Sequence, residues 1–320
     1  MVAEGRLGRS LLFVFLVAVL LYLPTIRFGY VQDDRAIVVA NPAAHGVGAA
    51  LRAFDQPYWP PPSEAGLYRP STILSLAIDW SISGGRPGWL HLANGLWHGL
   101  ACVLVVLVLA RWLPPVPAAV AGLVFAVHPV HVEGVASIVS RNELLATVGI
   151  LGAVLAARRA WWIAALTCTA LAMLSKEHAI VGGAVILLDD WLRPPDERHY
   201  PLWFYGLLGA VTAAYAIVWL RIGHAVTADV AAPFLGASAG RRLAMAFPAA
   251  LRAARVLVFP VSLSADYSPQ VIPYRTSISI TAILGAAVVL VVLAGGGAVR
   301  RRAPALCFGA LAAALACLPP

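Results

Sequence analysis

Residues 89–113 read WLHLANGLWHGLACVLVVLVLARWL, an apolar run whose single charged residue is Arg111. A run of this length can cross a hydrocarbon core of about 30 Å as one α-helix, which needs about 20 residues. Backbone N–H and C=O groups that face lipid cannot form hydrogen bonds with water, so they must bond to other backbone groups, as they do in a helix or a closed barrel. The run is too long and continuous for a barrel strand. This stretch therefore predicts a membrane-spanning helix.

Comparable apolar runs recur along nearly the whole chain. Nine spans are expected, at 10–26, 89–113, 115–130, 142–157, 160–175, 178–192, 202–222, 276–297 and 303–318. The first run lacks a small-residue cleavage site, so we expect a retained span rather than a signal peptide. The 320 residues are 61% hydrophobic and 12% charged, whereas soluble domains are about 45–50% apolar and about 25% charged. The prediction is an all-α, polytopic integral membrane protein forming one domain over 1–320.

The basic residues fit a membrane orientation better than a nucleic-acid partner, despite a net charge of +8. If every span crosses, one side of the membrane receives the arginines of the short loops: Arg6, Arg9, Arg111, Arg158, Arg159, Arg193, Arg198 and Arg300–Arg302. That side is expected to be cytoplasmic and to carry the N-terminus. In a bacterium the membrane would be the inner, or plasma, membrane. The expected contacts of these arginines are lipid headgroups.

Two long segments, 27–88 and 223–275, then face the extracytoplasmic side and are expected to carry the chemistry. The first contains a proline-rich turn at 57–62 and an apolar helix at 71–83 that we expect in the membrane interface. The second contains an apolar stretch at 241–260 with four arginines, which predicts an interfacial or re-entrant helix. The sequence stops directly after an apolar run, so we expect its C-terminus to be truncated.

The first long segment opens with an acidic pair, Asp33 and Asp34. A carboxylate just outside a membrane can accept a proton from an incoming hydroxyl if it lies within hydrogen-bond reach. The alternative is that the pair caps a short helix over 35–40, as aspartate often does. Both interpretations remain open at this stage.

The segment HPVHVE at 128–133 offers the imidazoles of His128 and His131 and the carboxylate of Glu133. A proline between the histidines disrupts the one-face helical geometry of zinc motifs, so we do not expect a metal. Polar groups at a membrane rim more often line a site or form internal hydrogen bonds. The four cysteines lie inside apolar runs without paired spacing, which argues against a zinc site or a disulfide.

His91, Asn94 and His98 fall on one helical face and either line a site or bond neighbouring helices.

Two short motifs precede further spans. Ser140 and Glu143 match the capping box S-x-x-E, a role at least as plausible for Glu143 as catalysis. Ser175 is a possible cap of the next span, and the helix dipole favours Glu177 there. Helix capping does not explain Lys176. A cation beside the free N–H groups at the start of a helix can bind a phosphate, so we expect a phosphate site there.

Taken in order, these motifs resemble the transmembrane and tetratricopeptide-repeat-containing O-mannosyltransferases and their bacterial relatives, within the GT-C superfamily. The matching stretches are Val31–Asp34 with Asn41-Pro42, Tyr68-Arg69-Pro70, His91–His98, Ala126–Glu133, Ser140–Glu143, Ser175–Glu177 and Pro260–Ser268. They extend over about 240 residues. Glu143 departs from the family pattern, which more often has aspartate. The sequence also contains no tetratricopeptide repeat, which leaves acceptor recognition open.

The resemblance implies a GT-C fold and an inverting glycosyl transfer on the extracytoplasmic face. The expected donor is a polyprenyl-phosphate-linked sugar, with mannose as the family's sugar, and the acceptor is a hydroxyl of a protein or glycan. Expected catalytic residues are Asp33 as base, with Asp34 and Glu133 in support, and the chemistry needs no metal or other cofactor. The donor phosphate is assigned to Arg69, Arg141 and Lys176, with the arginines of 241–255 in reserve. Residues expected to line the site are Tyr68, Asn94, His98, His128, His131, Glu143, Glu177, Asp266 and Tyr267.

Two other classes of function compete with a transferase. A lipid or solute transporter would tend to show inverted repeats and charges at mid-membrane depth. The sequence shows no repeat, and its charges cluster at one face. A membrane scaffold without activity would be indifferent to loss of Asp33.

Overall fold

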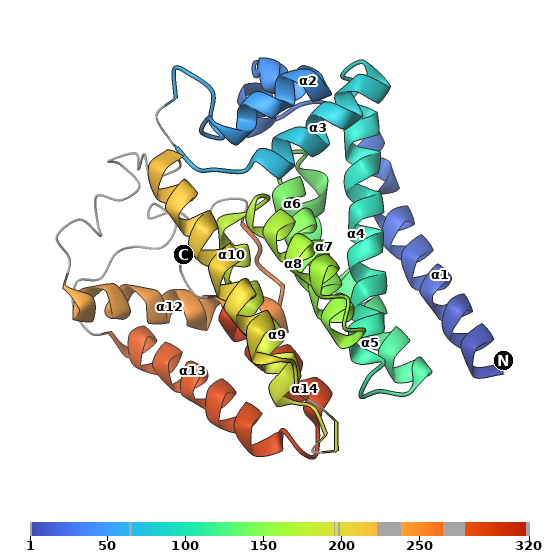
Figure 1. The fold of residues 1–320 in the computed structure, drawn as a ribbon, viewed down its shortest axis with the longest axis vertical. Coiled ribbons are helices and arrows are strands. Elements are labelled where there is room, and N and C mark those ends of the chain that lie inside the picture. The colour runs from blue at the N-terminus through green and yellow to red at the C-terminus, as the bar shows by residue number, and fades with distance from the viewer. Residues whose placement is uncertain are drawn as a thin grey trace. The chain divides into compact units, whose positions relative to one another are not determined.

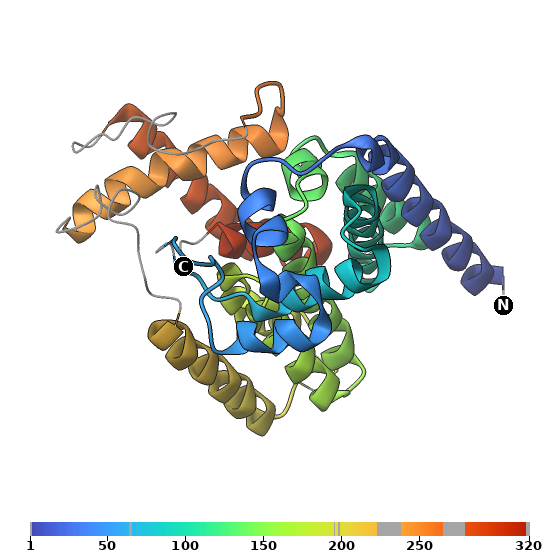
Figure 2. The ribbon, with the colours of Figure 1, turned by 90° about the horizontal axis from the view of Figure 1, so that it is seen from above.

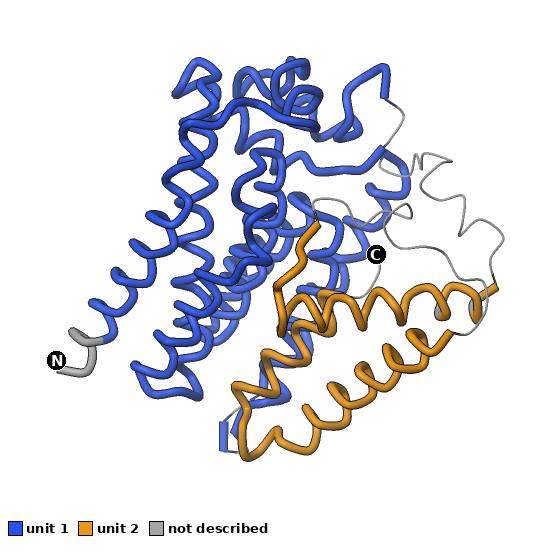
Figure 3. Tube along the Cα trace, turned by 180° about the vertical axis from the view of Figure 1, so that it is seen from behind, with its two compact units in different colours: residues 1–225, 320 blue, residues 226–319 orange. Residues whose placement is uncertain are grey.

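A computed structural model of the chain describes residues 2–63, 66–194, 196–197, 199–222, 238–264 and 279–317. The chain divides into two compact units, residues 1–225 with 320, and residues 226–319. Figure 3 colours the two units separately. The boundary between them falls in the predicted long segment at 223–275.

The first unit is a bundle of helices. Its long members are α1 (Val2–Tyr22), α4 (Pro87–Leu109), α5 (Pro115–Val127), α7 (Arg141–Arg158), α8 (Trp162–Met173), α9 (Gly182–Trp191) and α10 (Leu202–Ile222). In this bundle α4 packs against α1, α5 and α7, and α7 packs against α8 (Figure 1). Helix α4 is therefore the centre of the unit.

Two arginines show that α4 and α7 run in the same direction. At the start of α7, a terminal nitrogen (Nη2) of Arg141 donates to the Leu90 carbonyl at 2.9 Å. At its end, Arg158 donates from Nη1 to the Val108 carbonyl at 2.8 Å. The short connections between successive helices then place the ends of α4, α7 and α9 together with the starts of α5, α8 and α10. The predicted basic short loops of this unit gather at that end.

All nine predicted spans contain a helix, but only some of these helices are long enough to cross a membrane. Four segments in the described part of the chain are long and apolar enough to cross a membrane: Leu7–Arg27, Pro87–Leu109, Leu202–Ile222 and Ile280–Val299. Helices α5 and α8 are shorter, with 13 and 12 residues. Helix α5 begins at the predicted residue but ends at Val127, before Pro129, and tight turns flank α8, so residues 128–130, 160–161 and 174–175 of the predicted spans are not helical. The chain is a multi-pass membrane protein, and helix length alone does not support a count of nine crossings.

The segment before α4 folds into short helices. These are η1 (Leu23–Arg27), η2 (Arg35–Val39), η3 (Pro42–His45), α2 (Val47–Ala50), η4 (Leu51–Phe54) and α3 (Pro70–Ser83). The last of them confirms the helix predicted at 71–83. Figures 1 and 2 show this segment over the end of the bundle where α4 and α7 begin.

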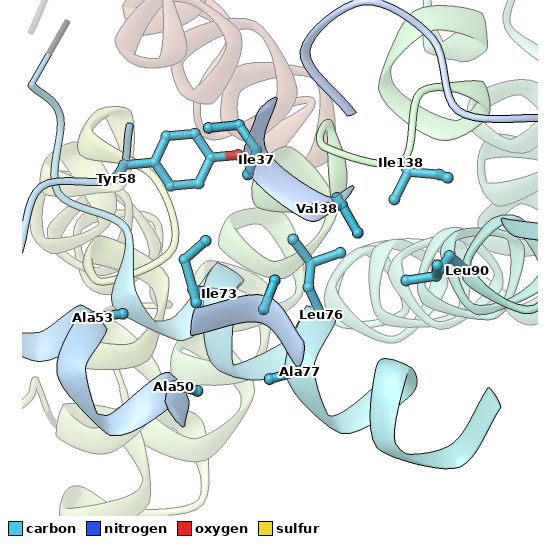
Figure 4. Packing of buried hydrophobic residues seen from close by; sticks show 11 residues of the cluster. Ile37, Val38, Ala50, Ala53, Tyr58, Ile73, Leu76, Ala77, Leu90 and Ile138 are labelled. Carbon is cyan, nitrogen blue, oxygen red and sulfur yellow. The ribbon is translucent and has the colours of Figure 1, made fainter. Parts of the chain in front are cut away.

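A buried apolar cluster holds that segment on the bundle. Ile37 and Val38 from η2 and Leu76 from α3 meet Leu90 of α4 and Ile138 from the turn before α7, and all five are at most 1% exposed (Figure 4). Burying such side chains contributes about 1.5–3 kcal/mol each relative to exposure. The loop is therefore a packed part of the unit, able to hold side chains in fixed positions.

The second unit contains α12 (Ala239–Val258), α13 (Ile280–Val299) and α14 (Pro304–Ala316). Helix α12 confirms the helix predicted at 241–260 and is not among the four segments apolar enough to span. It approaches α13 closely at Gly285, where any Cβ would collide with the Phe247 carbonyl. Glycine is therefore required at that crossing.

Candidate functional site

The acidic pair separates into one buried and one exposed carboxylate. Asp34 is 0% exposed. Its Oδ2 accepts from the backbone N–H of Val31 at 3.1 Å, and its Oδ1 accepts from that of Val139 at 3.0 Å. Burial raises the pKa of Asp34, and the two backbone hydrogen bonds counteract part of that rise. Asp34 thus fastens the loop to the turn before α7, whereas Asp33 is exposed.

The helix-capping interpretation of Asp34 is wrong. The turn η2 follows it directly, but the Asp34 side chain makes no capping hydrogen bond to η2. Both of its oxygens are directed to other donors, one of them 105 residues away in the chain. The structure leaves Asp33 as the member of the pair that an acceptor can reach.

Arg69 and Glu177 form a buried ion pair below this loop. Arg69 Nε donates to Glu177 Oε1 at 3.0 Å, and Nη2 donates to Oε2 at 2.9 Å. The side chains are 11% and 7% exposed. Burial alone would raise the pKa of Glu177, but the charge and hydrogen bonds of Arg69 outweigh it and lower that pKa. Both groups are therefore charged at neutral pH.

Lys176 lies beside this pair and contacts a second carboxylate. Its Nζ is 2.7 Å from Glu143 Oε1, and the two side chains are 16% and 52% exposed. The predicted capping box is absent here, because the Ser140 side chain makes no capping bond to α7. Glu143 is instead the partner of Lys176. Its exposure means that a ligand oxygen can replace it on the lysine.

The predicted cap at Ser175 is also wrong. Its hydroxyl donates to the Leu171 carbonyl at 2.7 Å and so belongs to the end of α8. Lys176 occupies the position directly before the short helix η5 (Glu177–Val181).

Tyr58 connects Asp33 with the Arg69–Glu177 pair. The Arg69 guanidinium carbon lies 4.9 Å from the centre of the Tyr58 ring. Burial raises the pKa of Tyr58; the charge of Arg69 lowers it, and those of Asp33 and Glu177 raise it further, so all three lie within electrostatic range. The charges of an exposed carboxylate and of Arg69 thus both act on one tyrosine. The sequence pattern indicates Tyr58 only as part of a proline-rich turn.

Arg141 is placed away from any surface that a phosphate can reach. It is 0% exposed. Its Nε donates to Asn94 Oδ1 at 2.8 Å, and its Nη1 pairs with Asp79 of α3. Asp79 also accepts from Trp89 Nε1 at 3.1 Å. Arg141 therefore joins α3, α4 and α7. It does not make the phosphate contact expected for it, because Asp79, which is distant in the sequence, already neutralises its charge.

Asn94 and His98 bond neighbouring elements, as the structural alternative predicts. Asn94 Nδ2 donates to the Ser137 carbonyl at 2.8 Å. His98 Nε2 lies 3.1 Å from the Ala126 carbonyl of α5. Tyr68 also forms an internal hydrogen bond, because its hydroxyl donates to the Phe54 carbonyl at 2.9 Å. These three side chains therefore stabilise the packing of the elements around the candidate site.

The two histidines of 128–133 face aromatic rings. The His131 ring centroid is 4.3 Å from that of Phe125 and 6.3 Å from that of His128. Burial and the neighbouring histidines lower the pKa of His131 to about 4, so the ring is neutral at pH 7. Glu133 is exposed in the first turn of α6 (His131–Ala136). Among the described residues, no three His, Cys, Asp or Glu side chains are grouped to hold a metal ion.

The structure thus brings together Asp33, Arg69, Lys176, Glu143 and Glu177, with Tyr58 as an addition. Two predicted residues, Asp266 and Tyr267, lie outside the described residues.

Comparison with known proteins gives matches among curated sequences. The chain is 36% identical over 209 residues to the Drosophila melanogaster protein O-mannosyl-transferase Tmtc2, covering 59% of this chain and 22% of that protein. It is 31% identical over 166 residues to human TMTC3, covering 48% and 18%. A Caenorhabditis elegans protein O-mannosyl-transferase is 27% identical over 272 residues, covering 81% and 39%.

The chain therefore spans about a fifth to two fifths of the length of these curated relatives. No family model matches it, and no solved structure matches it. The similarity to several proteins of one name, at 27–36% identity, confirms the resemblance of this chain to the TMTC protein O-mannosyl-transferases.

Proposed function

We propose that this chain carries the catalytic membrane region of a glycosyltransferase that moves mannose from a polyprenyl-phosphate carrier to a protein hydroxyl on the extracytoplasmic face. The observation that carries the proposal is the exposed Asp33 within electrostatic range of Tyr58, which lies against Arg69. A base for the acceptor and a cation for the leaving phosphate are the two groups that such a transfer needs. The names of the relatives supply the sugar and the acceptor class.

In the proposed reaction the acceptor hydroxyl transfers its proton to Asp33 as its oxygen attacks the anomeric carbon. The bond from that carbon to the phosphate oxygen breaks, the electron pair stays on the phosphate, and the configuration at carbon inverts. Asp34 acts as a positioning residue, because it fixes the loop that carries Asp33. Glu133, exposed on α6, is assigned to orienting the acceptor.

The growing charge on the phosphate needs fixed cations. Lys176 is assigned to this role first, because its partner Glu143 is half exposed and can be displaced. Arg69 supports it from a buried position held by Glu177. We propose that these cations suffice and that no metal takes part.

The test uses the purified chain in lipid nanodiscs with synthetic polyprenyl-phosphate mannose and a protein acceptor. Asp33→Asn keeps the side-chain size but cannot accept the proton, so transfer should fall by about 100-fold or more. Its melting temperature should stay unchanged, since Asp33 is exposed. Asp34→Asn is the comparison for stability and should lower the melting temperature, because one of the two oxygens that accept backbone N–H groups becomes an N–H donor.

Two results would contradict the proposal at different points. Near-normal transfer by Asp33→Asn would remove Asp33 as the base. Absence of any mannose transfer from the lipid carrier by the folded wild-type chain would remove the function itself.

A further inference from the structure

Four buried polar atoms around the Arg69–Glu177 pair have no hydrogen-bond partner. They are the hydroxyls of Tyr58 and Tyr215, Nδ1 of His178 and Nε1 of Trp219. The two tyrosines are only 4% and 7% exposed. Buried polar atoms in folded proteins are nearly always paired, so a cluster of unpaired ones calls for an explanation such as a bound ligand or water.

These four groups come from different parts of the first unit, and three of them lie within electrostatic range of Arg69 and Glu177. The Tyr58 ring lies against Arg69, and His178 directly follows Glu177. Tyr215 of α10 is within electrostatic range of Glu177 and Arg69. Trp219 lies one turn further along α10 and packs in the same apolar cluster as Tyr215. Tyr58, His178 and Tyr215 therefore all lie within electrostatic range of the ion pair, and Trp219 packs in the same cluster as Tyr215.

Apart from the exposed Asp33, the charges at this place are paired, which limits the kind of ligand. Arg69 is paired with Glu177 and Lys176 with Glu143. The unpaired groups themselves are neutral: two hydroxyls that donate or accept, an indole N–H that donates, and an imidazole nitrogen. A neutral ligand rich in hydroxyls satisfies such a set, because each hydroxyl both donates and accepts.

We propose that Tyr58, His178, Tyr215 and Trp219 form the binding site for the hexose ring of the lipid-linked donor. The inference rests on the proposed function and adds to it the groups that recognise the sugar. In this arrangement the sugar hydroxyls pair with the four groups and with the remaining lone pairs of Glu177. The phosphate then lies toward Lys176.

The test uses two substitutions that each delete one hydroxyl, Tyr58→Phe and Tyr215→Phe. Because these hydroxyls have no partner in the unliganded protein, their loss should leave the melting temperature unchanged or raise it. Each variant should raise the KM for polyprenyl-phosphate mannose by about 3- to 10-fold, the worth of one neutral hydrogen bond. The double variant should lose about 10- to 100-fold.

Tyr205→Phe is the matched control on the same helix. Its hydroxyl is already paired, donating to Asp190 Oδ2 at 2.7 Å at the other end of α10. This variant should lower the melting temperature while leaving the donor KM unchanged.

Binding measured without turnover separates this inference from the proposed function. Wild type should bind polyprenyl-phosphate mannose more tightly than polyprenyl phosphate, and the double variant should lose that difference while binding the bare phosphate equally well. Equal wild-type affinity for the two lipids, or a double variant with unchanged sugar preference, would overturn the sugar site and assign the unpaired groups to water. A preserved sugar preference without any transfer would instead overturn the proposed function.

Discussion

Neighbouring residues at this site have different environments, and the environment assigns their roles. Lys176 and Ser175 are adjacent, yet the lysine is 16% exposed beside a displaceable carboxylate, whereas the serine is 1% exposed and bonded to α8. A charge that a ligand can reach contributes to binding, and a buried hydroxyl with a fixed partner contributes to stability. The same contrast separates Asp33 from Asp34.

Lys176→Ala tests this assignment. Hydrogen bonds to charged groups are worth about 1.5–3 kcal/mol, so transfer should fall by roughly 10- to 150-fold. Because charge on the phosphate grows as the sugar leaves, kcat should fall together with donor affinity. Steady-state kinetics at varied donor concentration measures both.

Ser175→Ala is its control and should cost about 1 kcal/mol of stability, with little effect on the donor step. If Lys176→Ala lowers the melting temperature while kcat and donor KM stay within about twofold, the lysine is structural. The phosphate would then be sought at Arg69 or at the arginines of α12.

At the scale of secondary-structure elements, α7 is fixed at both ends by arginines, one buried and one partly buried. Arg141 joins its start to α3 and α4, and Arg158 joins its end to α4 and to Asp189 of α9. Because α3 belongs to the loop before α4, the Arg141–Asp79 pair also holds the loop that carries Asp33. The position of the candidate base therefore depends on a contact between elements.

Asp79→Ala should expose that dependence. Removing one partner of a buried ion pair leaves an uncompensated charge and costs about 3–5 kcal/mol. The melting temperature should drop sharply, and the double variant Asp79→Leu with Arg141→Met should recover part of it, since well-packed apolar residues can replace a buried pair. Thermal unfolding of both variants in the same detergent makes the comparison. A double variant as unstable as the single one would show that Arg141 has a further essential contact.

For the whole molecule, the proposed reaction requires a defined orientation in the membrane. The basic short loops predict that the end of the bundle carrying Arg159 faces the cytoplasm and the end carrying Ser83 faces the other side. With the native cysteines replaced, a cysteine at Ser83 should react with an impermeant thiol reagent in intact cells. A cysteine at Arg159, which is exposed, should react only after permeabilisation. Reversed labelling would place the candidate site in the cytoplasm and contradict the proposed donor.

The class of fold can be predicted from the sequence alone, because hydropathy is a local property of consecutive residues. Helices occur in all nine predicted spans, and α3 and α12 lie where the two interfacial helices were expected. The order of short motifs was also sufficient to indicate the related family. Lys176 and Asp33 were identified as candidates from residue type and position alone.

Which polar groups are already paired depends on contacts between elements that are distant in the sequence. Arg69 and Glu177 are 108 residues apart, and Arg141 and Asp79 are 62 apart, so no local pattern indicates either pair. Helix packing likewise buries Asp34 but leaves Asp33 exposed, and it gathers Tyr58 and Tyr215 around one ion pair without giving them partners. A side chain's pairing depends on which distant elements pack against it, and that information resides in the fold.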